Sequence, residues 1–72
     1  MYEFELFIGE NYRIAEETAL RVNKLEGVYR CGITKWLYDN KWYVTVAIKN
    51  SEKDEIQEEI LKIHNDVTNE FK

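Results

Sequence analysis

The sequence predicts a two-layer α+β fold, in which two helices cover one face of a three-stranded antiparallel sheet. Three observations predict it. Residues 2–8 alternate in polarity, and residues 28–49 contain two β-rich runs on either side of Asp39-Asn40. Residues 12–26 and 52–71 carry apolar side chains at helical spacing. The expected order is strand, helix, strand, strand, helix, within a single domain of residues 1–72.

The first strand is indicated by a strict alternation that ends at Gly9. Its apolar face consists of Tyr2, Phe4, Leu6 and Ile8, and its other face of Glu3, Glu5 and Phe7. Such a period of two is typical of a half-buried strand. We therefore expect the apolar set to face the helices and the other set to face away.

The first helix is expected to begin after Asn11, a residue type favoured as an N-cap, and to run to about Glu26 before Gly27. Its core-facing stripe consists of Ile14, Ala15, Thr18, Val22 and Leu25. Leu20 lies nearly opposite this stripe. We interpret it as an ordinary exposed leucine, with a contact point as the alternative.

The second helix is expected to begin after Ser51 as N-cap, with Asp54 three residues later as an imperfect capping box. Acidic residues in its first turn suit the positive end of the helix dipole. Its apolar face consists of Ile56, Ile60, Ile63, Val67 and Phe71. The pattern predicts a long amphipathic helix.

Residues 28–49 are predicted to form one long β-hairpin with Asp39-Asn40 as a two-residue turn. This register pairs, on the core side, Leu37 with Trp42, Ile33 with Val46, and Cys31 with Ile48. On the other side it pairs Trp36 with Tyr43, Thr34 with Thr45, and Arg30 with Lys49. Lys35 points to the core side of an edge strand, which we interpret as protection against edge pairing.

The topology follows from the handedness of the chain. A right-handed crossover from the first strand to the second leaves a gap that the third strand fills, antiparallel to both. The sheet order becomes 2-3-1, and both helices lie on one face. This is the split β-α-β layout of ferredoxin-like proteins without a fourth strand. The first strand forms an edge that could accept a strand from a partner.

Composition narrows the classes of function. The chain has 72 residues, one cysteine, no proline and a net charge of −4. A single cysteine gives no internal disulfide, and no spacing of cysteine and histidine indicates zinc. No apolar run reaches membrane-spanning length. We expect a cytoplasmic protein without a cofactor.

Two residues are candidates for catalysis. His64 lies at the edge of the second helix's apolar stripe, and no nucleophile or ligand is spaced beside it. Cys31 lies among apolar neighbours on the core face, where a buried, inert thiol is the expected state. We therefore expect a protein that is not an enzyme.

The sheet face without helices is the expected binding surface, because it gathers aromatic and cationic side chains. The predicted partner-binding residues are Phe7, Arg30, Trp36, Tyr38, Tyr43 and Lys49. An open aromatic patch of this kind is rarely left uncovered in a small monomer. The sequence thus predicts a protein-interaction module that binds itself, as a homo-oligomer such as a homodimer, or binds another protein. The alternative is that these aromatic pairs only stabilise the sheet.

Part of the sequence resembles RNA-recognition-motif domains. Leu6-Phe7-Ile8-Gly9 is similar to the first-strand motif of that family, and residues 41–48 lie where it carries its third-strand motif. The resemblance implies base stacking on Phe7 and Tyr43. Trp36 would add a third stacking ring, and the phosphates would be contacted by Arg30, Lys41 and Lys49. Single-stranded nucleic-acid binding is therefore an alternative function. Thr45, Trp42 and Val44 depart from the family pattern, the fourth strand is missing, and the net charge disfavours phosphate.

The acidity of the last helix indicates a third possible function. Residues 51–72 contain seven acidic and three basic side chains. Such a run could imitate DNA phosphates, as an inhibitor of a DNA-binding protein would. Lys53 and Lys62 interrupt the run, and a solvated helix face is the ordinary interpretation.

Overall fold

The computed structural model describes all residues 1–72 and contains the five predicted elements in the predicted order. These are β1 (Tyr2–Gly9), α1 (Tyr12–Val22), β2 (Val28–Trp36), β3 (Lys41–Ile48) and α2 (Lys53–Glu70), with a short 3-10 helix, η1 (Asn50–Glu52), before α2. Neither α-helix combines the length and the apolar character needed to cross a lipid bilayer.

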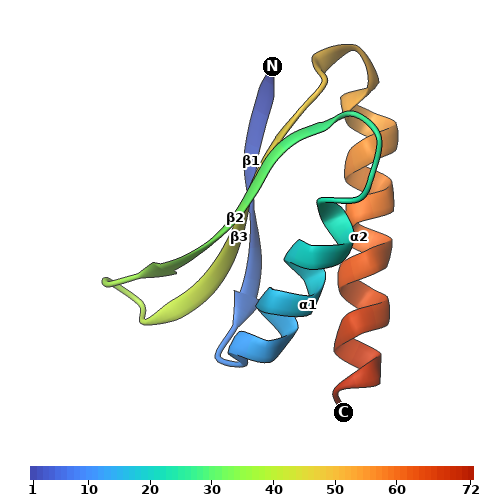
Figure 1. Ribbon diagram of the computed structural model, residues 1–72. Helices are drawn as coiled ribbons and strands as arrows, with labels where there is room; N and C mark the ends of the chain where they lie inside the picture. The colour runs from blue at the N-terminus through green and yellow to red at the C-terminus, as the bar shows by residue number, and fades with distance from the viewer.

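The sheet has the order β1-β3-β2, and both strand pairs are antiparallel. Both helices lie on one side of it (Figure 1). The prediction of an α+β, ferredoxin-like fold without the fourth strand is confirmed. The Cα trace measures 32 × 27 × 16 Å, and the helices cover only one face of the sheet. The opposite sheet face is called the outer face below.

The core lies between the central strand and the two helices. From β3 it takes Val44, Val46 and Ile48, all essentially inaccessible to solvent. Ala15 and Val22 reach it from α1, and Ile56 and Ile60 from α2, at the predicted helical spacing. Thr18 of α1 is also fully buried, and its hydroxyl has no hydrogen-bond partner.

The predicted two-residue turn is wrong, because the hairpin closes with four residues, 37–40. Trp36 pairs with Lys41, and the amide of Asn40 donates to the carbonyl of Trp36 at 2.8 Å. Asn40 has the left-handed φ of 60° that asparagine tolerates. Asp39 Oδ1 accepts from the amide of Lys41 at 3.0 Å, so this side chain stabilises the wider loop.

The wider loop moves the register of the hairpin by two residues. Ile33 therefore faces Val44 rather than Val46, and Thr34 faces Tyr43 rather than Thr45. A shift of two preserves which face each side chain occupies. The consequence is largest for Leu37, predicted opposite Trp42, which lies in the loop with 96% of its surface exposed. Lys35 takes the position opposite Trp42.

One end of each helix differs from the prediction. Asn11 is confirmed as the N-cap of α1, since its side chain accepts from the amide of Arg13 at 3.0 Å. The helix ends at Val22 rather than near Glu26, because i→i−3 hydrogen bonds tighten the chain through Leu25. Ser51 is not an N-cap. It lies within η1, and the capping position of α2 is Glu52, whose side chain makes no capping bond.

Candidate protein-interaction face

Three rows of side chains cross the outer face, one residue from each strand. The register gives Glu3–Ala47–Arg30, then Glu5–Thr45–Gly32, then Phe7–Tyr43–Thr34, and Lys41–Trp36 follow towards the hairpin loop. The alternation of side chains in β-strands brings these residues together. Towards the hairpin loop, the side chains in the rows change from charged or small to mostly aromatic.

Four aromatic side chains form a continuous row near the hairpin loop. Ring centroids are 5.4 Å apart for Phe7 and Tyr43, and 5.7 Å apart for Tyr43 and Trp36, both edge-to-face. Tyr38, 88% exposed, extends the row with its ring 6.4 Å from that of Trp36. The hairpin end projects away from both helices (Figure 1). We call Phe7, Tyr43, Trp36 and Tyr38 the aromatic row.

Acidic side chains hold two members of the aromatic row in place. Trp36 Nε1 donates to Glu5 Oε2 at 3.2 Å, across the central strand. The hydroxyl of Tyr43 donates to Asp39 Oδ2 at 2.7 Å. Both rings are therefore fixed by hydrogen bonds to β1 or to the loop, which lowers the entropy they would lose on binding.

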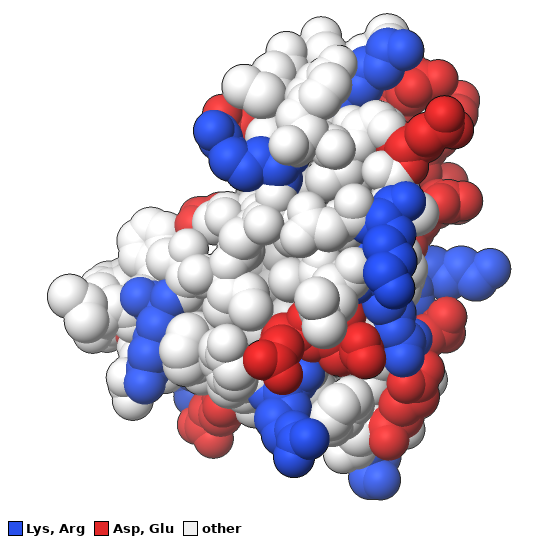
Figure 2. Space-filling view, in the orientation of Figure 1, with Lys and Arg blue, Asp and Glu red and all other residues white.

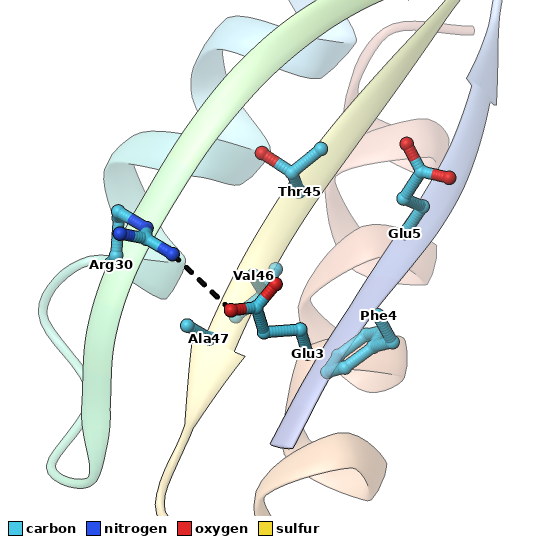
Figure 3. A pocket seen from close by; sticks show the side chains of 7 residues that line it. All are labelled: Glu3, Phe4, Glu5, Arg30, Thr45, Val46 and Ala47. Carbon is cyan, nitrogen blue, oxygen red and sulfur yellow. Dashed lines mark hydrogen bonds and ion pairs between the residues drawn. The ribbon is translucent and has the colours of Figure 1, made fainter. Parts of the chain in front are cut away.

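The other half of the outer face is a shallow hollow of about 450 Å³. Figure 3 shows Glu3, Glu5, Arg30, Thr45 and Ala47 around it. The Arg30–Glu3 ion pair, at 3.3 Å, crosses β3 above Ala47 and leaves that residue 2% exposed (Figure 3). Gly32 adds no side chain beside Thr45, and a Cβ placed there would be 3.6 Å from Thr45 Oγ1.

Cations near this face are already paired. Arg30 contacts Glu3, and Lys41 Nζ contacts Glu10. The Lys41 ammonium also holds the pKa of Glu10 below its ordinary value, through its hydrogen bond. Since the charge of each cation is offset by a carboxylate, this face offers little net attraction for a phosphate backbone.

The predicted pairing of Arg30 with Lys49 is wrong. The wider hairpin loop shifts the register by two residues, so Arg30 faces Ala47, and a bulge follows only between Val28 and Arg30. Lys49 lies beyond the end of β3, where its ammonium is 3.8 Å from Glu52.

Of the six predicted partner-binding residues, the structure brings four together in the aromatic row. Arg30 lies at the other end of the outer face, beside the hollow, and Lys49 lies outside the outer face. Sequence reasoning did not identify the contributions of Glu5, Asp39 and Gly32. The alternation of side chains along a strand predicted that Glu5 and Gly32 lie on the outer face, but their contacts depend on the register of the strand pairs.

The two catalytic candidates lie apart from this face, on the helix side. Burial raises the pKa of the Cys31 thiol to about 11, and its Sγ is 3.8 Å from the carbonyl oxygen of Ala19. Burial lowers the pKa of His64. No group of three or more His, Cys, Asp or Glu side chains is placed to hold a metal ion.

The Tyr43–Asp39 hydrogen bond predicts a titration that can be measured. Together with burial and the Asp39 charge, it raises the pKa of Tyr43 from 10.0 to about 12. The contribution to stability is therefore fully present below pH 10 and is lost as the pH rises through about 12. Tyrosinate absorbance should show this late component in the natural protein, and Asp39→Asn should move it to lower pH. Tyr43→Phe identifies the component, and a titration that Asp39→Asn leaves unchanged would contradict the assignment.

The chain was compared with protein families, curated proteins and solved structures, and it matches none of them. The outer face must therefore be interpreted from its own geometry.

Proposed function

We propose that this protein is a cytoplasmic, non-enzymatic interaction module that binds a second copy of itself through the outer face. The observation that carries the proposal is that one face holds both a projecting aromatic row and a hollow. In a two-fold dimer each copy presents the same surface to the other. The row of one copy can then enter the hollow of its partner, and the reverse contact follows by symmetry.

The residues of the face also suit a protein partner. Aromatic residues and arginine are enriched at the energetic centres of interfaces, where they are surrounded by polar groups. The hydrogen bonds to Glu5 and Asp39 hold Trp36 and Tyr43 in position before binding. A rigid aromatic anchor loses little rotamer entropy when it is covered.

The domain has a small interior of its own, which favours a partner that covers the outer face. A second copy would also add a layer to a domain in which only 12 of 72 residues are buried.

Sedimentation velocity over a range of concentrations tests the proposal. The natural protein should sediment as a dimer at high concentration, and Trp36→Ser with Tyr43→Ser should shift it to the monomer. Gly32→Val should do the same by adding a branched side chain to the outer face beside Thr45, which lines the hollow, while its Cβ makes only an ordinary contact in the monomer. Each change should weaken association by at least about tenfold, the effect expected at an interface centre.

Leu20→Ser is the matched control, because Leu20 is exposed on α1, away from the outer face. It should leave association unchanged. A protein that stays monomeric at high concentration, or an association that the outer-face variants do not alter, would contradict the proposal. Titration with labelled single-stranded oligonucleotides at low salt tests the alternative function. Binding there that depends on Phe7 and Tyr43 would favour nucleic acid instead.

A further inference from the structure

The free edge of β1 is a second surface, separate from the outer face. β3 pairs with β1 on one side only, and β1 is the last strand of the sheet. None of the backbone hydrogen bonds outside the helices and strands involves residues 2–9. The opposite row of amide and carbonyl groups of β1 is therefore open to another strand. The edge of β2 is less regular, because a bulge interrupts it near Tyr29.

A groove runs beside this edge, between β1 and α2. Its volume is about 440 Å³. Phe4 and Leu6 of β1 and Leu61 of α2 form its apolar part. Leu61 is 56% exposed, although it faces this groove rather than open solvent on all sides. The groove can therefore accept apolar side chains from a strand paired with β1.

The fold itself indicates what fits there. In the ferredoxin-like fold a fourth strand follows the second helix. By a right-handed crossover from β3 over α2, that strand reaches the β1 edge and runs antiparallel to β1. No strand of residues 1–72 occupies this position. The helix that would support such a strand, α2, is nevertheless present along the groove.

The charges around the groove select the partner. Every charged residue that lines it is acidic: Glu5, Asp54 and Glu58. Acidic side chains also gather on the side of the molecule where α2 lies (Figure 2). A strand bearing lysine or arginine would thus find complementary charge at both margins of the groove.

The same charges disfavour a second copy of β1 as the occupant. In an antiparallel, two-fold pair centred on Phe4, Glu3 would face Glu5 of the other copy. In a pair centred on Glu5, the two Glu5 side chains would face each other. Like charges placed directly opposite are destabilising in a sheet.

We propose that the β1 edge binds an extended segment of another protein by strand addition. The segment alternates apolar residues with lysine or arginine and pairs antiparallel with β1. Its apolar side chains fill the groove over Phe4, Leu6 and Leu61, and its cations lie on the other side of the added strand beside Glu5, while Asp54 and Glu58 add negative potential at the helix margin of the groove. Backbone hydrogen bonds supply affinity, and the groove supplies selectivity.

A fluorescent eight-residue peptide, the length of β1, tests this proposal by anisotropy. Its sequence alternates valine and lysine. Methylating the backbone nitrogens along one edge of the peptide should abolish binding, and methylating those along the other edge should not, because only one edge pairs with β1. A peptide with glutamate in place of lysine should not bind.

Two pairs of protein variants sharpen the test. Leu61→Ser should weaken binding by about tenfold. Leu20→Ser, which changes a leucine of nearly equal exposure on α1, should leave binding unchanged. Glu58→Lys should weaken binding roughly threefold or more, whereas Glu55→Lys makes the same change of charge on α2 outside the groove.

Three results would overturn the inference: no binding of the alternating peptide, equal binding of both methylated peptides, or equal effects of Leu61→Ser and Leu20→Ser. Protection of β1 amides that grows with protein concentration, without peptide, would assign the edge to a second copy and also overturn it. Gly32→Val separates this site from the outer face, since it should block self-association and leave peptide binding intact.

Discussion

Ile60→Ala is expected to destabilise the protein by about 2–5 kcal/mol, the cost of removing a buried isoleucine side chain and leaving a cavity. Ile60 is fully buried where α2 meets the core cluster around β3. A small domain has a free energy of unfolding of only about 5 kcal/mol or a little more. The variant should therefore be largely unfolded, or should unfold at a much lower urea concentration, when followed by circular dichroism.

The neighbouring residue supplies the control. Leu61→Ala removes a leucine side chain one position later, on the exposed side of the same helix. It should change the free energy of unfolding by no more than about 0.5 kcal/mol. Ile60→Val, expected to cost about 0.5–1.5 kcal/mol, keeps the comparison measurable if the alanine variant does not fold. Equal effects at the two positions would contradict the described packing of α2.

Gly27→Ala is expected to destabilise the protein by at least about 1–2 kcal/mol, the cost of a left-handed backbone for a residue with a Cβ. Gly27 has a φ of +85°, and its carbonyl accepts from the amide of Lys49 at 2.8 Å, where the start of β2 meets the end of β3. The added Cβ would also lie 2.6 Å from Ile56 Cδ1, so a core side chain would have to move.

Gly32→Ala is the matched control for Gly27→Ala. Gly32 does not have a positive φ, and an added Cβ would make only an ordinary contact with Thr45. Alanine there should be neutral or slightly stabilising, because glycine weakens a strand. Urea denaturation of both variants measures the difference. Equal stabilities would show that the conformation described for Gly27 is wrong.

The layers and faces could be predicted from the sequence because they depend on periodicity alone. A period of two in residues 2–8 and in the hairpin assigns Phe7 and Tyr43 to the same face, whatever the pairing. The sheet order followed from the handedness of the crossover. A register error of two residues does not change which face a side chain occupies. The aromatic row could therefore be predicted although the predicted hairpin turn was wrong.

The loop and the helix ends depend on individual hydrogen bonds that periodicity does not report. Asp39 stabilises a four-residue loop by accepting from the amide of Lys41 and the hydroxyl of Tyr43. A two-residue turn at Asp39-Asn40 has the same strand parity, so the sequence pattern could not separate the two loops. Ser51 is a residue type favoured at the N-cap, but it lies within a 3-10 helix, and α2 begins only at Lys53.

The hollow on the outer face could not be predicted for a similar reason. Parity placed Glu3, Arg30 and Ala47 on one face, but their alignment across the sheet depends on the register set by the four-residue loop and by the pairing of β1 with β3. Only that alignment brings the Arg30–Glu3 pair above Ala47 and places Gly32 beside Thr45. The hollow on which the proposed dimer depends is therefore a consequence of register.

The most direct test of the outer face as an interface is to map backbone amide shifts of isotope-labelled protein by NMR at low and high concentration. We expect concentration-dependent changes at Phe7, Thr34, Trp36 and Tyr43, and none at Leu20 or Leu61. Gly32→Val should abolish these changes while the rest of the spectrum stays that of a folded protein. Spectra that do not change with concentration, or changes confined to α1 and α2, would contradict the account.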